Sequence, residues 1–367
     1  MKIAFRVDAS IQIGTGHVMR CLTLADELTR QGHKCQFICR EHEGHLGDLV
    51  VSKGYELTLL PGFQSVERPQ NDSSDQTYSN WLGCDWQTDA QQCSEILSRF
   101  KPDWLVVDHY ALYFRWEDVS RRYVRRILVI DDLADRVHSC DLLLDQNLGR
   151  NEADYQDLVP DHCSLLIGPR FALLRPEFAR LREYSLKRRE HPKLRKLLIT
   201  MGGVDKDNAT GMVLEVLKGC HLPADCRIDV VMGTNAPWLG DVQEMVTQMP
   251  WPTEISVNVD DMAQRMADAD LAIGAAGSTS WERCCLGLPT LMAVLADNQQ
   301  SIGEALHQSG AAVLLGVPSN TDFNVKCAER FTLLHKDKIN LKSMTQAAAA
   351  ITEGTGAQLV ISRILSI

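Results

Sequence analysis

Long apolar runs are missing from this chain of 367 residues, of which 45% are hydrophobic and 23% charged. No stretch approaches the roughly 20 apolar residues that a membrane-spanning helix needs. Lys2, Arg6 and Asp8 lie in the first expected strand, so we expect no signal peptide. Basic residues are also few: 38 lysines and arginines stand against 48 aspartates and glutamates. A formal net charge of −10 argues against a general binder of nucleic acid or of anionic membranes.

Cys-x-x-Cys pairs are missing too, although the chain contains 12 cysteines. Scattered thiols in a chain of this size are typical of a reduced compartment, so we expect a cytoplasmic protein without a zinc site. His42 and His45 lie beside Glu41 and Glu43, but their spacing is not that of the zinc helix motif and favours a solvated loop. We therefore expect neither a metal ion nor a cofactor.

The first half is organised around a strand, a glycine loop and a helix. The apolar run Ile3–Phe5 predicts the strand, and Gly14–His17 leads into the helix. This loop is neither the three-glycine dinucleotide fingerprint nor a Gly-Lys-Ser/Thr phosphate loop, which disfavours nicotinamide cofactors and ATP. His17 is either a surface residue of a turn or a general base that the helix N-terminus keeps neutral. In the second case Asp8 or Ser10 would hold its other ring nitrogen.

Further strands end in polar residues, as catalytic residues of α/β folds do. The apolar runs 104–107, 127–130 and 142–144 end in Asp108-His109-Tyr110, Asp131-Asp132 and Asp145-Gln146-Asn147. A single such ending is usually a turn or a helix cap, whereas several predict a polar crevice. The aperiodic stretch 61–83 is predicted to be a mobile loop over this edge.

The second half repeats the alternation of strands and helices. Apolar runs at 197–201, 228–231, 255–259, 271–273 and 290–294 predict its strands. We expect an α/β protein of two doubly wound Rossmann-like domains that face each other across a cleft. The first domain covers 1–165 and the second 193–367, with 166–192 as a connection that contains a solvated, arginine-rich helix. The last helix is allowed to pack back on the first domain.

A small-residue turn in the second half predicts an anion site. Gly277-Ser278-Thr279 lies between a strand and a helix, where exposed backbone N–H groups suit a diphosphate. Glu282 has a competing explanation, because Thr279 and Glu282 have the spacing of a capping box worth about 1 kcal/mol. Gly202-Gly203 and Asn298-Gln299 follow two other strands and would approach the same ligand.

Taken in order, these motifs resemble the UDP-sugar hydrolases of pseudaminic acid biosynthesis, which act on UDP-2,4-diacetamido-2,4,6-trideoxy-β-L-altropyranose. The resemblance covers residues 3 to about 300. That family in turn resembles the two-domain glycosyltransferases of the GT-B fold, such as the one that builds lipid II. The matching motifs are Arg6-x-Asp8-x-Ser10, Gly14-x-Gly16-His17, Asp108-His109-Tyr110, Met201-Gly202-Gly203, Gly277-Ser278-Thr279 with Glu282, and Asn298-Gln299.

The resemblance implies a role for each group. His17 would activate the attacking water, and Tyr110 would shape the sugar site. Glu282 would hold the ribose, with the Gly277–Thr279 turn at the diphosphate and Asn298 at the phosphates or the sugar. The expected substrate site is completed by Arg6, Asp8, Ser10, Gly14, Gly16, Asn147, Gly202, Gly203 and Gln299. The implied partner is a small UDP-sugar in a pathway linked to flagellin glycosylation, and the oligomeric state stays open, with a monomer acceptable.

The expected reaction is cleavage of the C1–O bond with release of UDP. One displacement by water with inversion at C1 would suffice, because fixed N–H donors can stabilise the leaving group. Three alternatives remain open: a GT-B glycosyltransferase, a hydrolysing UDP-sugar 2-epimerase, and a nucleotide-sugar sensor without turnover.

Overall fold

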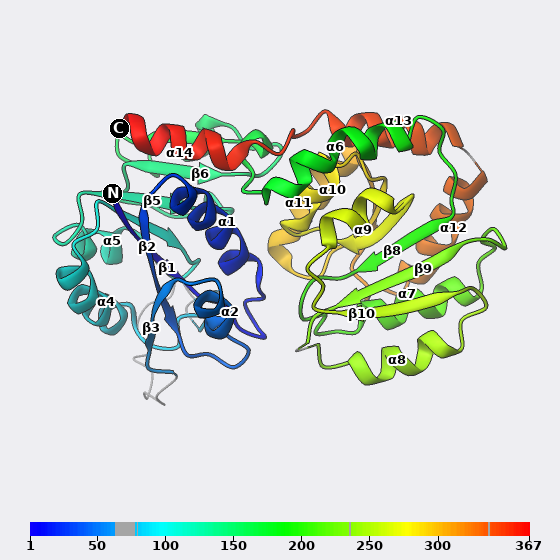
Figure 1. Ribbon diagram of the computed structural model, residues 1–367, viewed down its shortest axis with the longest axis horizontal. Helices are drawn as coiled ribbons and strands as arrows, with labels where there is room; N and C mark the ends of the chain where they lie inside the picture. Colours follow the sequence, from blue (N-terminus) through cyan, green and yellow to red (C-terminus); the bar gives the residue numbers. More distant parts are fainter. Residues whose placement is uncertain (63–77, 79, 235, 337) are drawn as a thin grey trace. The chain divides into compact units, whose positions relative to one another are not determined.

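The computed structural model describes residues 1–62, 78, 80–234, 236–336 and 338–367, so most of the loop expected at 61–83 lies outside the described residues. The chain forms two compact units: unit 1 is Met1–Leu173 with Ala357–Ile367, and unit 2 is Leu174–Gly356. Each unit contains one wholly parallel sheet with helices on its faces (Figure 1). The expected α/β class with two doubly wound domains is confirmed. None of the described helices is long and apolar enough to cross a membrane.

The sheet of unit 1 has seven strands in the order β3-β2-β1-β4-β5-β6-β7. Its strands and helices are β1 (Lys2–Val7), α1 (Gly16–Arg30), β2 (Lys34–Arg40), α2 (Gly47–Ser52), β3 (Glu56–Leu60), α4 (Trp86–Phe100), β4 (Trp104–Asp108), α5 (Phe114–Ser120), β5 (Arg126–Ile130), β6 (Leu142–Asp145), β7 (Ser164–Ile167) and α14 (Gly356–Ser366).

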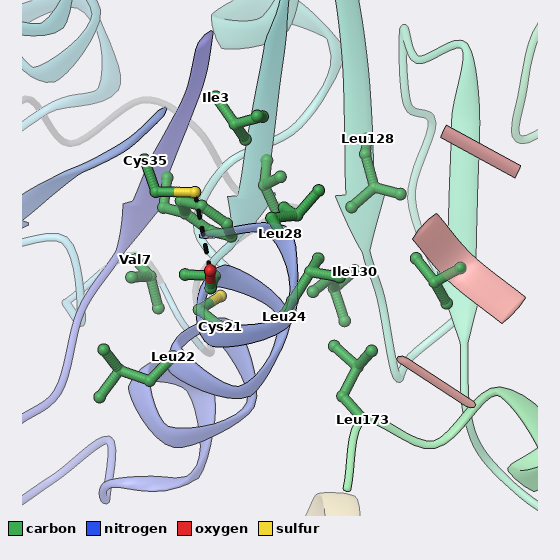
Figure 2. Packing of buried hydrophobic residues seen from close by; sticks show 14 of the residues in the cluster. Ile3, Val7, Cys21, Leu22, Leu24, Leu28, Cys35, Leu128, Ile130 and Leu173 are labelled. Carbon is green, nitrogen blue, oxygen red and sulfur yellow. Dashed lines mark hydrogen bonds between the residues drawn. The ribbon is translucent and has the colours of Figure 1, made fainter. Parts of the chain in front are cut away.

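Alternation along β1 divides the core of unit 1 into two layers. Ile3, Phe5 and Val7 pack on the same side as α1, which contributes residues at helical spacing such as Leu24 and Leu28 (Figure 2). On the other side Ala4 joins the layer formed with α4 and α5. Helix α14 returns to the first layer through Val360, Ile361 and Ile364, which are at most 2% exposed.

The sheet of unit 2 has six strands in the order β10-β9-β8-β11-β12-β13. Its strands and helices are α6 (Pro176–Arg188), β8 (Lys196–Thr200), α7 (Ala209–Lys218), β9 (Arg227–Met232), α8 (Leu239–Thr247), β10 (Thr253–Val257), α9 (Met262–Asp268), β11 (Leu271–Ala275), α10 (Thr279–Cys285), β12 (Thr290–Ala293), α11 (Gln300–Gln308), β13 (Ala312–Gly316), α12 (Phe323–Lys336) and α13 (Lys338–Ala349).

The arginine-rich helix α6 is solvated on one side only. Arg189, just after the helix, is 3% exposed and donates to the carbonyl oxygens of Met266 and Ala269 at 2.8 and 2.6 Å. Arg182 likewise donates to Ala349 O at 2.7 Å. The prediction of a solvated helix is therefore wrong for these side chains, because guanidinium groups satisfy carbonyl oxygens at the ends of neighbouring helices.

Candidate active site

In unit 1 the predicted residues gather where the strand order reverses. From β1 the chain adds β2 and β3 on one side of the sheet and then β4 on the other. Val7 pairs with Asp108, so the loops that follow β1 and β4 leave the sheet side by side. Such a switch point at the carboxyl ends of the strands is where open α/β sheets bind ligands.

The loop after β1 is shaped by Ser10 and Gly14. Ser10 Oγ accepts from the N–H groups of Gln12 and Ile13 at 3.1 and 2.9 Å, and Gly14 N–H donates to Ser10 O at 2.8 Å. Gly14 has a φ of 82°, which a residue with a Cβ rarely adopts. Ser10 and Gly14 therefore shape the turn that leads to Gly16, the first residue of α1, and to His17.

His17 is oriented by a carboxylate from β4, the strand that pairs with β1. Its Nδ1 lies 2.6 Å from Asp108 Oδ1, and the same carboxylate accepts from Arg20 Nε at 2.6 Å and from Arg20 Nη2 at 2.7 Å. The expectation that Asp8 or Ser10 holds this nitrogen is wrong. An ionised carboxylate only accepts, so the Nδ1 that faces it carries a proton, and in the neutral imidazole Nε2 is then the nitrogen with the lone pair.

Arg20 keeps the two carboxylates beside His17 ionised. Burial alone would raise the pKa of the Asp108 carboxyl, but Arg20 and His17 outweigh it and hold that pKa well below its usual range. Arg20 also holds the pKa of Asp132 low against the effect of burial, and its Nη2 lies 2.8 Å from Asp132 Oδ2. Asp108 therefore meets His17 Nδ1 as an ionised acceptor.

Two more predicted residues join the cluster through Asp132. Tyr110 Oη donates to Asp132 Oδ2 at 2.7 Å, and Asn147 Nδ2 donates to Asp132 Oδ1 at 3.2 Å. The ring of Tyr110 also meets His17 edge-on, with centroids 4.7 Å apart. His17, Tyr110 and Asn147 are thus brought together. Of the groups that connect them, Asp132 was expected in the polar crevice, whereas Arg20 was missed by the sequence reasoning.

Arg6 and Asp8 belong to a second, deeper cluster. Both are fully buried; Arg6 donates to Asp8 at 2.6 Å and to Asp89 of α4 at 2.7 and 3.1 Å. Asp8 Oδ2 also faces His109 Nε2 at 3.3 Å and His42 Nε2 at 3.7 Å. The prediction that His42 lies in a solvated loop is wrong, because its side chain is only 12% exposed and turns toward this carboxylate. Asp8 thus contacts histidines from the loops that follow β2 and β4.

In unit 2 the predicted glycines also lie at a switch point, between β8 and β11. Gly202 and Gly203 follow β8, and Gly277 follows β11; Thr200 and Gly274 pair directly. Gly202 has a φ of 90°. A Cβ on Gly233 after β9 would fall 2.0 Å from Gly203 O, so the loops after β8 and β9 approach at backbone distance.

The turn between β11 and α10 is braced by an arginine that the sequence reasoning missed. Arg283 is 1% exposed and donates to Ala275 O at 2.6 Å and to Thr279 Oγ1 at 3.3 Å. The backbone N–H groups of Gly277, Ser278 and Thr279 donate to no acceptor within the described part of the chain. Beside them, Gln299 Nε2 lies 3.5 Å from where a Cβ on Gly277 would stand.

The capping box expected for Glu282 does not form. Helix α10 takes Ser278 as its N-cap, without a side-chain capping bond, so Glu282 is the fourth helical residue and not the third. Burial raises the pKa of Glu282 to about 7, although Arg175 and Arg283 lower it. No described residue donates a hydrogen bond to its half-buried carboxylate. Asn298 lies in a short helical turn, Asp297–Gln299, that follows β12.

Comparisons with known proteins agree with the resemblance. The chain is 27% identical over 314 residues to the UDP-2,4-diacetamido-2,4,6-trideoxy-beta-L-altropyranose hydrolase of Campylobacter jejuni, which covers 85% of this chain and 98% of that protein. The resemblance carried by the motifs is confirmed. The chain is also 25% identical to the uncharacterized protein MJ1062 of Methanocaldococcus jannaschii. That match covers 80% of this chain and about half (55%) of that protein's length. No protein-family profile matches.

A solved structure shares the fold across the whole chain. The crystal structure of MurG from Acinetobacter baumannii has a TM-score of 0.70, covering 100% of this chain and 99% of that one. Its sequence identity is 16%, so the comparison concerns the fold and not the reaction.

Proposed function

We propose that this chain hydrolyses the bond between C1 and the phosphate oxygen of a UDP-linked 2,4-diacetamido-2,4,6-trideoxyhexose, as a step of pseudaminic acid biosynthesis. The observation that carries the proposal is the contact of 2.6 Å between His17 Nδ1 and Asp108 Oδ1 at the switch point of unit 1. It leaves Nε2 as a proton acceptor, and the Campylobacter relative supplies the substrate class.

In the proposed step a water donates its proton to His17 Nε2 while its oxygen forms a bond to C1. The C1–O bond breaks, and its electron pair leaves with UDP. The ionised Asp108 stabilises the imidazolium that forms, and general-base help of this kind is typically worth about 10²–10⁴-fold. Tyr110 and Asn147, held by Asp132, border the sugar.

Unit 2 is proposed to bind the nucleotide. The N–H groups of Gly277, Ser278 and Thr279, which donate to no described acceptor, would donate to the diphosphate, which carries the negative charge that develops as UDP leaves. Glu282 would accept from the two ribose hydroxyls, since its carboxylate has no donor among the described residues. Gly202 and Gly203 allow the backbone to approach the ligand closely.

Turnover in ¹⁸O-labelled water tests which bond breaks. We expect the label on the C1 oxygen of the free sugar and none on UDP, with an inverted anomer seen by NMR before mutarotation. Label on UDP would refute attack at C1, and retention would refute a single displacement. A changed configuration at C2 would indicate an epimerase, and a requirement for a second sugar or lipid hydroxyl would indicate a transferase.

A further inference from the structure

Three aromatic rings lie beside His17, and two of them have no part in the proposed reaction. Trp81 stacks on Tyr110, with centroids 5.5 Å apart and planes inclined by 25°. Tyr78 meets both rings edge-on, 4.8 Å from Trp81 and 5.1 Å from Tyr110. The His17 ring lies 4.7 Å from Tyr110 and 6.4 Å from Trp81. The proton acceptor is thus bordered by an aromatic surface, defined here as Tyr78, Trp81 and Tyr110.

Trp81 is held in place by the residues that follow it. Leu82 is 2% exposed and belongs to the core layer under α4 and α5. Gly83 has a φ of 74°, and a Cβ there would come within 2.9 Å of His42 Cε1, so the turn requires glycine. Trp81 itself is half-buried, and its indole N–H donates to no described residue. An anchored aromatic ring beside a general base suits contact with a ligand.

We propose that Trp81, together with Tyr78, forms the apolar part of the sugar site and makes the protein select 6-deoxyhexoses. The inference rests on the proposed function and adds the property of the sugar that is read. A C6 methyl group and acetamido methyl groups pack favourably on aromatic faces. A C6 hydroxyl packed against the faces of these rings would lose its hydrogen bonds to water, because a ring face offers no strong hydrogen-bond partner.

The test compares two UDP-sugars that differ at C6 alone. These are UDP-2,4-diacetamido-2,4,6-trideoxyhexose and its 6-hydroxy counterpart of the same configuration. Because an apolar surface discriminates against one added hydroxyl by up to about 10²-fold, we expect a preference of about 10- to 10²-fold in kcat/KM for the 6-deoxy sugar. Trp81→Ala should reduce this ratio to less than about threefold, whereas Trp81→Phe should keep most of it. The matched control is Tyr184→Ala, an aromatic of α6 that is 48% exposed.

The same ratio is measured as a ratio of Kd values, which does not require turnover. If Trp81→Ala loses the preference for the 6-deoxy sugar while the Kd of UDP alone is unchanged, the inference is supported. This holds even if no sugar is released, in which case only the proposed hydrolysis has failed. Wild-type protein without a 6-deoxy preference would overturn it. So would a Trp81→Ala variant that keeps the preference, or one that weakens both sugars equally.

Discussion

Replacing His17 with Asn removes the proposed base while leaving its surroundings paired. Asp108 keeps both hydrogen bonds to Arg20, at 2.6 and 2.7 Å, so no buried carboxylate is left alone. We expect kcat to fall by about 10²–10⁴-fold, which corresponds to about 2.7–5.4 kcal/mol of lost transition-state stabilisation. The loss should appear in kcat and not in the Kd of UDP, because the nucleotide is proposed to bind unit 2.

The same structure limits the cost in stability. The variant loses one charge-assisted hydrogen bond, and such bonds contribute about 1.5–3 kcal/mol. The amide of Asn can replace part of it. UDP release measured with a coupled assay gives kcat, calorimetry gives the Kd of UDP, and thermal unfolding gives Tm. His191→Asn, at an exposed position of unit 2, is the matched control and should change none of the three.

A kcat within about threefold of wild type would remove His17 from the chemical step, since a general base contributes at least about 10²-fold. A large fall in Tm with normal activity per folded molecule would show that the contact with Asp108 serves stability alone.

Further substitutions separate binding, positioning and stability. Glu282→Gln should weaken UDP by about 1–3 kcal/mol through loss of a charged acceptor. Because the pKa of Glu282 is raised from 4.5 to about 7, the stability that its protonated form contributes is full below pH 4.5 and lost as pH rises through 7. At pH 8 the variant should therefore have a higher free energy of unfolding, by up to about 3 kcal/mol, and a higher Tm. A lower Tm with unchanged UDP binding would contradict this. Tyr110→Phe removes the bond of 2.7 Å to Asp132, and we expect a fall of roughly tenfold in kcat without a change in UDP affinity; unchanged steady-state kinetics would exclude the hydroxyl. Arg6→Met leaves Asp8 and Asp89 buried with one partner fewer, so denaturation should show a loss of about 3–5 kcal/mol. Intact stability with a raised KM would instead make Arg6 a substrate ligand.

Sequence reasoning located the strands whose ends carry polar residues, because apolar runs followed by Asp or Gly are local patterns. It chose the wrong partner for His17, since Asp108 is remote in sequence and becomes a neighbour only when β4 pairs with β1. Arg20 could have been predicted from the sequence, because a residue three positions after His17 lies on the same face of α1.

Other errors came from features that a pattern does not resolve. A shift of one residue in the start of α10 removed the capping box from Glu282. The short strands β7 and β13 were not predicted, because four or five apolar residues do not distinguish a strand from a turn of helix. Trp81 lies at the end of a stretch without periodicity, and only its ring contacts reveal it.

The return of α14 to unit 1 has a consequence for how the protein is made. The core layer that contains Leu142, Leu144 and Leu166 is completed by Val360, Ile361 and Ile364, which are synthesised only after the whole of unit 2. At about 5–20 residues per second, unit 2 takes roughly 10–40 s to be synthesised. During that time the part of the layer that α14 will cover stays exposed to solvent. Unit 2 is contiguous and is free to fold first. Expressed alone, residues 174–356 should stay soluble, whereas residues 1–173 should require a chaperone or aggregate.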